Sequence, residues 1–387
     1  MAWLTKRRPR FNVAHDYSKG QSMKIIHCAD IHLDSKLEAN LQGEKRKIRK
    51  AELLDSLADM VEYAIHHEFD AVIIAGDLFD TAKITRSTLT SVAGLISRNP
   101  GLEFYYLKGN HDAERALENE LIGCPNFHTF GRTWTTYRIG EEKNITISGA
   151  ELSADNNDIY NTLMLNPGDF NIVVLHGQNT MYGAKDRAEY IDVSALKNKA
   201  IDYLALGHVH KYEEGELDRR GIYCYPGCLE GRGFDECGKH GFVTLDIDER
   251  SGKLERRFVV SSKRELYAVE ADVSGCADTF AAVSAARRYI EQAGADHKDL
   301  VKIVLTGEVS EDISFDTDYI AGQLADEYFF VKVYDRTGVK IDISRYMKDV
   351  SLKGEFIRLV YEDEGLDEES RNLIIKTGIS ALRGEEF

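Results

Sequence analysis

Carboxylate, imidazole and amide side chains recur in five short patterns within the first 210 residues. The patterns are D-x-H from Asp30, G-D-x-x-D around Asp77, G-N-H-D around Asn110, H-G at His176 and G-H-x-H around His208. A pair of divalent metal ions needs such ligands, together with one carboxylate that bridges the two ions. Five of the twelve histidines lie in these patterns. The sequence therefore predicts a dinuclear metal site, with Asp77 as the bridge.

Each pattern lies at or just past the end of an apolar run that is typical of a buried strand. The runs are 23–29, 69–76, 102–109, 169–177 and 201–208, and helical patterns occupy 44–68 and 84–98. This alternation predicts a buried parallel sheet with crossover helices, in which ligands gather at the carboxyl ends of the strands. Glycines beside the ligands, such as Gly76 and Gly109, allow the chain to turn sharply as it leaves each strand.

Two pairs of ligands are separated by a single residue. In extended backbone, side chains two residues apart point to the same side. We therefore expect Asp30 and His32 to bind one metal ion together, and His208 and His210 likewise to bind one metal ion together.

The stretches "ADIHLD", "AGDLFD", "KGNHD", "VVLHGQ" and "LGHVH" resemble the five signatures of the calcineurin-like metallophosphoesterases. "CADIHLDS", "GNHD" and "YPG" are most similar to the DNA repair nuclease branch, the SbcD-like and YhaO-like exonuclease subunits. The resemblance covers Met23 to about Val260. It implies an α/β fold with a four-layer αββα core, a small α+β capping domain and C-terminal helices.

The resemblance also implies a role for individual residues. One metal ion would be held by Asp30, His32, Asp77 and His210, and the other by Asp77, Asn110, His176 and His208. Manganese is typical of this branch, with iron, magnesium or zinc as alternatives. His111 matches the histidine that protonates the leaving oxygen or stabilises the transition state, a role that suits an imidazole near neutral pH. Asp80 lies where some relatives have a second histidine, so it either orients His111 or a water, or caps the following helix.

Changes in pattern along the chain predict four parts. We expect a leader or disordered tail at 1–22, a nuclease domain at 23–262, a small α+β capping domain at 263–345 and a helical tail at 346–387. Apolar stripes on two tail helices, including Leu352, Phe356 and Leu359, could pack on the tail's own domain or dock on a partner.

The formal net charge of −16 argues against a protein that holds DNA by bulk electrostatics. Local basic side chains would have to contact phosphates, and the candidates are Lys45 and Arg46 in "GEKRKIRK", with Arg187 and Arg232 further along. A solvated helix start is the alternative for the first two.

The implied function is a metal-dependent phosphodiesterase that acts on DNA as an exonuclease or endonuclease subunit, through in-line attack of a metal-activated water. The implied partners are DNA, an SbcC-like coiled-coil ATPase and a second copy of the chain. A small-molecule phosphoesterase with the same metal site and a scaffold without catalysis are the alternatives.

The absence of a long apolar run and of paired cysteines favours a cytoplasmic protein with no membrane contact. A zinc set of Cys224, Cys228, Cys237 and His240 is a weaker interpretation than core or loop thiols.

Overall fold

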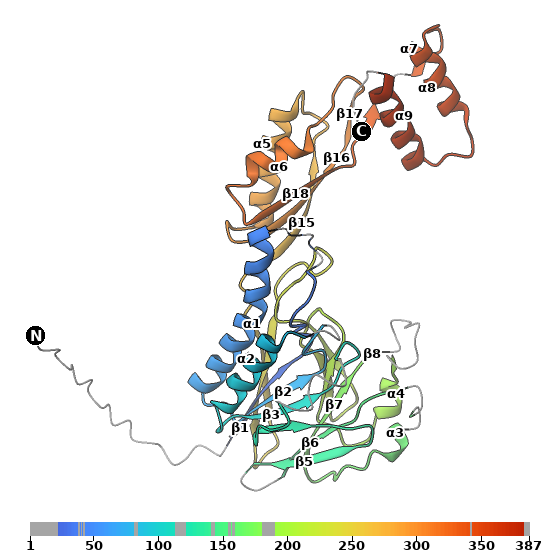
Figure 1. The fold of residues 1–387 in the computed structure, drawn as a ribbon. Coiled ribbons are helices and arrows are strands. Elements are labelled where there is room, and N and C mark those ends of the chain that lie inside the picture. The colour runs from blue at the N-terminus through green and yellow to red at the C-terminus, as the bar shows by residue number, and fades with distance from the viewer. Residues whose placement is uncertain are drawn as a thin grey trace, which may run out of the picture.

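Two six-stranded sheets and a smaller α+β unit make up most of the computed structural model (Figure 1). The structure describes residues 22–37, 39, 41, 43–80, 84–112, 121–140, 144–153, 156, 159–179, 190–340 and 343–382. The leader predicted at 1–22 lies outside this range except for its last residue.

The first sheet has the spatial order β14-β13-β1-β2-β3-β4, and the second β11-β12-β10-β7-β6-β5. The bounds in the first sheet are β1 Ser22–Cys28, β2 Ala71–Ala75, β3 Glu103–Leu107, β4 Phe127–Thr129, β13 Gly241–Asp248 and β14 Leu254–Val260. Those in the second are β5 Thr135–Ile139, β6 Ile145–Gly149, β7 Phe170–His176, β10 Tyr203–Gly207, β11 Glu213–Glu216 and β12 Ile222–Tyr225. The neighbours β1-β2-β3 and β6-β7-β10 are parallel, so their carboxyl ends share an edge in each sheet.

The sheets pack face to face, and side chains that alternate along each strand divide between two cores. Ile73 of β2 joins Ile172 of β7 and Tyr203 of β10 in the core between the sheets. The adjacent residues Val72 and Ile74 point the other way, against the helices. Because successive side chains point to opposite faces, a strand with every residue buried, such as β2, belongs to a sheet that is covered on both faces.

Helices cover the outer face of each sheet. Helices α1 (Gly43–His66) and α2 (Arg86–Ser97) lie on the first sheet, and the one-turn helices α3 (Ile159–Thr162) and α4 (Val193–Leu196) lie on the second (Figure 1). The result is the predicted mixed α/β core with four layers. None of the helices that the structure describes is long and apolar enough to cross a membrane.

A second, smaller unit follows β14. Its parallel sheet has the order β15-β16-β18, with β15 Leu266–Asp272, β16 Leu300–Thr306 and β18 Phe330–Asp335. Helices α5 (Thr279–Ala293) and α6 (Thr317–Leu324) cover one face, and Asp278 and Asp316 cap their amino termini. The N-terminal end of α1 reaches this unit (Figure 1), where the Lys45 ammonium lies 5.9 Å from the Phe329 ring centre.

The tail forms three helices beyond the small unit: α7 (Ile343–Tyr346), α8 (Leu352–Glu362) and α9 (Glu368–Leu382) (Figure 1). Ile357, Val360, Ile375 and Ile379 form their own buried core. Leu352 and Leu359 are instead 73% and 61% exposed. The predicted stripe of α8 is thus divided between a buried and an exposed side.

Two short parallel pairs complete the described strands. One consists of β17 (Glu308–Ser310) and β19 (Gly338–Lys340), and the other of β8 (Gln178–Asn179) and β9 (Tyr190–Ile191).

The five predicted core strands are present, but they lie in two sheets and not in one. β1, β2 and β3 belong to the first sheet, whereas β7 and β10 belong to the second. The apolar runs by themselves favoured a single sheet, because a run of buried apolar residues does not specify its neighbours. Two sheets agree instead with the αββα core that the family resemblance implied. The candidate ligands consequently approach one another from two facing sheets.

His27 of β1 links the sheets through its Nδ1 atom, which lies 2.9 Å from the Tyr203 hydroxyl oxygen. The imidazole is buried, and burial lowers its pKa from the ordinary value of 6.5 to about 3. Below pH 6.5, His27 is therefore protonated in the unfolded chain but stays neutral in the folded chain. The folded state loses stability as the pH falls from 6.5 toward 3.

We expect this one group to remove about 2 kcal/mol from the free energy of unfolding between pH 7 and pH 5. In His27→Gln, which cannot be protonated, that part of the pH dependence should disappear. Urea denaturation at both pH values measures it, with the exposed His66→Gln as control. Equal pH dependence in His27→Gln and the unsubstituted protein would contradict a neutral, buried His27.

Candidate metal centre

The loops that leave the parallel strands have unusual backbone conformations. Asp30, His32, Asp77 and His208 have φ angles of +52°, +49°, +51° and +96°. Residues other than glycine avoid this left-handed region, and such strain collects at functional sites. The surrounding packing holds it: Asp30 N donates to the Gly76 carbonyl at 3.1 Å, and His32 N donates to the Asp77 carbonyl at 2.9 Å.

His176, at the end of β7, is anchored by one ring nitrogen. Nδ1 lies 2.8 Å from the Ala75 carbonyl oxygen, which can only accept a hydrogen bond, so Nδ1 carries the proton. Nε2 then presents a lone pair. It lies 2.9 Å from Asn110 Oδ1 and 3.3 Å from Asp77 Oδ2. Three acceptor atoms thus converge, as they do around a cation.

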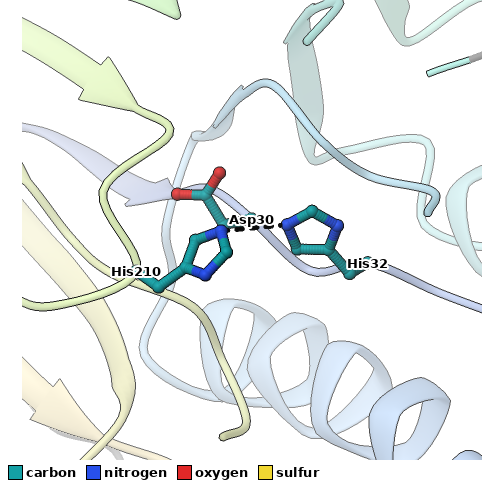
Figure 2. A group of neighbouring side chains, drawn as sticks. All are labelled: Asp30, His32 and His210. Atoms are coloured by element: carbon teal, nitrogen blue, oxygen red, sulfur yellow. Dashed lines mark hydrogen bonds between the residues drawn. The ribbon is translucent and has the colours of Figure 1, made fainter. Parts of the chain in front are cut away.

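His32 and His210 are anchored in the same way. The Nδ1 of His32 lies 3.0 Å from Asp80 Oδ1, and the Nδ1 of His210 lies 2.6 Å from Glu236 Oε1. Both partners are carboxylates, so the protons again belong on Nδ1. The two Nε2 atoms then face each other at 3.2 Å, beside the Asp30 carboxylate (Figure 2). Two lone pairs this close repel each other unless a proton or a metal ion lies between them.

The carboxylates at the centre are buried. Asp30 is fully buried, and burial raises its pKa although its two oxygens each accept from His208 N at 3.0 Å. Burial would likewise raise the pKa of Asp77, but the neighbouring His176 and His32 hold it well below its usual range. Burial lowers the pKa of His208 to about 4, with help from the charge of His176. For His176, burial would lower the pKa, but Asp77 and Asp30 raise it to about 9, so a cation that binds to Nε2 takes the place of a proton there.

These donors fit a pair of divalent ions. Potential ligand atoms of Asp30, His32 and His210 lie within 4.8 Å of one another, as do those of Asp30, Asp77 and His176. Carboxylate oxygen and neutral imidazole nitrogen suit manganese, iron or zinc. The two groups share Asp30, and Asp77 Oδ2 also lies 3.7 Å from His32 Nε2, so the arrangement can hold two ions that lie close together.

His208 and His210 belong to different halves of the centre. The His208 ring lies 5.4 Å from that of His176, with Nδ1 3.4 Å from Asn110 Oδ1, whereas the His210 ring lies 5.0 Å from that of His32. The prediction that these two side chains point the same way was wrong, because the positive φ of His208 interrupts the extended backbone. Asp30 and His32 do lie together, although their backbone is not extended either.

His111 is the most accessible histidine at this edge, with 46% of its side chain exposed. Its backbone N–H donates to Asp77 Oδ1 at 2.9 Å, and its Nδ1 lies 3.6 Å from Asp80 Oδ1. Asp80 therefore contacts both His32 and His111, which agrees with the orienting alternative. The capping alternative fails for α2, because the residue that caps this helix is Thr85.

Asp112 and Gly109 fix the position of Asp77. The buried Asp112 carboxylate accepts from the backbone N–H groups of Phe79 at 2.8 Å and Gly109 at 2.9 Å, so it joins the loops after β2 and β3. A Cβ atom on Gly109 would lie 2.1 Å from Asp77 Oδ1. Only glycine allows this approach.

The predicted substrate-binding residues are distributed over different surroundings. Arg46 is exposed on α1, Lys45 lies against Phe329, and Arg187 falls outside the described residues. Arg232 is 8% exposed, and its guanidinium lies 2.7 Å from Glu236 Oε1 and 3.4 Å from Asp80 Oδ1. Its place favours support of the site over contact with a substrate.

Sequence reasoning missed Glu236. Its spacing from Arg232 allows an ion pair, but nothing in the sequence connects it to His210, 26 residues earlier.

The four residues of the zinc alternative are not assembled into a site. Cys228 Sγ lies 3.2 Å from His240 Nδ1, but among the described residues the candidate ligand groups contain no cysteine.

Comparison with known proteins agrees with this geometry. Residues 23–212 match the family model of calcineurin-like phosphoesterases. This part of the chain is a calcineurin-like phosphoesterase domain. This family consists of metal-dependent phosphoester hydrolases that use a dinuclear metal site.

Curated relatives are more distant. An uncharacterized metallophosphoesterase, YhaO of Bacillus subtilis, is 26% identical over 58% of this chain and 57% of its own length. The DNA double-strand break repair protein Mre11 of Methanopyrus kandleri is 27% identical over 65% of this chain and 60% of its own. The SbcD component of the Escherichia coli nuclease SbcCD is 26% identical over 60% and 66%, respectively. The chain thus spans less than two thirds of the length of each of these three relatives.

Gly109→Ala tests the placement of Asp77. The added methyl group must displace the Asp77 carboxylate, so we expect Mn²⁺ affinity to fall by about tenfold or more. Titration followed by electron paramagnetic resonance measures free Mn²⁺, and circular dichroism checks the fold. Gly101→Ala is the control, since a Cβ there would meet no atom within 4 Å. Wild-type Mn²⁺ affinity in Gly109→Ala would contradict the central place given to Asp77.

Proposed function

We propose that this protein is a nuclease subunit that hydrolyses phosphodiester bonds in DNA with two divalent metal ions. We propose manganese as the native metal. The observation that carries the proposal is the convergence of anchored imidazole Nε2 atoms on Asp30 and Asp77 beside the accessible His111. The Mre11 and SbcD names of the relatives support DNA as the substrate.

The chain's own residues divide the work. Asp30, His32, Asp77 and His210 would hold one ion, and Asp77, Asn110, His176 and His208 the other. When bound, two such ions activate a water and offset the negative charge of the phosphate oxygens. His111 is close enough to this centre, and exposed enough, to give a proton to the departing oxygen. Asp80 Oδ1, 3.6 Å from His111 Nδ1, would orient the ring toward that position.

Three substrates distinguish this proposal from its alternatives. The purified protein with Mn²⁺ is offered linear duplex DNA, single-stranded DNA and bis-p-nitrophenyl phosphate. Cleavage of DNA supports the nuclease. Cleavage of the small diester alone, even with the partner ATPase present, would favour a small-molecule phosphoesterase, and no cleavage of any substrate would favour a silent scaffold.

His111→Ala should lower kcat on DNA by about 10²–10⁴-fold, the usual contribution of a general acid. Mn²⁺ affinity should stay within about twofold of wild type, because the His111 side chain is not among the proposed ligands. The exposed His66→Ala is the control. Normal cleavage by His111→Ala would show that another group protonates the leaving oxygen.

The exposed apolar side of α8 is the proposed docking surface for the SbcC-like coiled-coil ATPase. Leu352 and Leu359 lie seven residues apart, so they occupy the same side of the helix. Such a helix face is a common element of helix-in-groove recognition. The SbcCD name of the Escherichia coli relative supports a partner subunit. The homodimer implied by the resemblance also stays a prediction.

Replacing both Leu352 and Leu359 by Glu should abolish co-purification with the co-expressed ATPase subunit. The small diester should still be hydrolysed at the wild-type rate, because α8 has its own core away from the metal centre. Met164→Glu alters a side chain that is 91% exposed in the phosphoesterase domain and serves as the control. Retention of the ATPase by the double variant would contradict docking through α8.

A further inference from the structure

A buried ion pair lies behind the metal centre, in the segment that connects β12 to β13. Arg232 and Glu236 are each 8% exposed. Glu236 Oε2 accepts from the Arg232 backbone N–H at 2.7 Å, and Oε1 accepts from the Arg232 guanidinium at 2.7 Å. Each carboxylate oxygen is therefore committed, and the side chain has one orientation.

Glu236 uses that orientation to hold His210. Its Oε1 accepts a hydrogen bond from the His210 Nδ1–H group at 2.6 Å. The Nε2 lone pair of His210 is then directed at the Nε2 of His32. The Arg232 Nη2 atom is also 3.1 Å from His210 Nδ1, but two protonated groups cannot bond to each other, so the carboxylate is the partner of both. A carboxylate behind a ligand histidine fixes the ring and increases its basicity.

Arg232 connects this anchor to a second one. Its Nη1 lies 3.4 Å from Asp80 Oδ1, the atom that holds the Nδ1 of His32. One guanidinium therefore bridges the two carboxylates that orient the two histidines facing each other across the centre. Its planar fork suits such a bridge better than a lysine would.

The small unit holds this segment in place. Phe234, between the two charged residues, stacks on Phe330 of β18 with ring centres 6.3 Å apart. The Lys302 ammonium of β16 lies 5.6 Å from the Phe234 ring centre, and Gly238 N donates to the Leu266 carbonyl of β15 at 3.1 Å. The segment thus contacts all three strands of the small sheet on one side and the metal centre on the other.

We propose that Arg232 and Glu236 are positioning residues, which set the affinity of one of the two metal positions by orienting His210 and His32. This inference rests on the metal site of the proposed function. It assigns a role to Glu236 and replaces DNA contact as the role of Arg232. It requires neither DNA as substrate nor an ATPase partner.

Mn²⁺ binding to the full chain tests the proposal without an activity assay. The wild type should bind two Mn²⁺ ions and show the electron paramagnetic resonance signal of a coupled pair. Glu236→Ala should bind one ion with wild-type affinity and the other about 10–100-fold more weakly, with loss of the coupled signal. Glu236→Gln keeps an acceptor oxygen for His210, so it should recover part of the lost affinity.

Glu230→Gln is the matched control. Glu230 is also a buried carboxylate in the same segment, but it pairs with Arg49 at 3.0 Å and Ser56 at 2.7 Å, away from the metal centre. It should lower thermal stability and leave both Mn²⁺ affinities unchanged. Arg232→Ala should weaken the same metal position as Glu236→Ala, and Arg232→Lys should restore it only in part.

Two results would overturn the inference. One is wild-type binding of both ions by Glu236→Ala, and the other is an equal loss of affinity in Glu230→Gln, which would mark a general loosening of the fold. A wild-type chain that binds no Mn²⁺ would overturn the metal site of the proposed function and this inference with it. Normal Mn²⁺ binding without DNA cleavage would contradict the nuclease alone.

Discussion

The location of one proton on each of three imidazoles determines what the shared edge of the two large sheets can bind. In each ring the Nδ1–H group donates a hydrogen bond to a fixed acceptor. The acceptor is Asp80 for His32, the Ala75 carbonyl for His176 and Glu236 for His210. Each Nε2 lone pair is then directed inward, and the ring cannot turn over without breaking its Nδ1 hydrogen bond. With the proton on the other nitrogen, the same rings would present N–H groups to the centre and exclude a cation.

The sandwich makes this arrangement possible because it brings two sets of strand ends together. Asp30 follows a strand of the first sheet, and both of its oxygens accept from the backbone of His208, which follows a strand of the second. Left-handed backbone at these positions is unfavourable by itself, at about 1–3 kcal/mol for each residue. The two cores and the Asp112 carboxylate between adjacent loops hold that strain in place.

Sequence patterns predicted the strands that carry candidate ligands, because those strands are buried on both faces and appear as apolar runs. They did not predict β4 and β5, which are short or more exposed, or β6, which is buried but carries the polar residues Thr146 and Ser148 between its apolar ones. The apolar runs also gave no sign that the core is divided into two sheets. Arg49 illustrates a second limit. Within "GEKRKIRK" it looks like its exposed neighbours Lys47 and Lys50, yet it is buried against Glu230. The partner lies 181 residues away, beyond any local pattern.

The five residues from Arg232 to Glu236 contact the metal centre through Glu236 and the small unit through Phe234. If Glu236 orients His210 for cation binding as proposed, binding at the centre and the position of the small unit are thermodynamically linked. A displacement that separates Phe234 from Phe330 and shifts Glu236 must weaken cation binding by some factor. Bound cations must oppose that displacement by the same factor, so the small unit is held more firmly on a loaded centre than on an empty one.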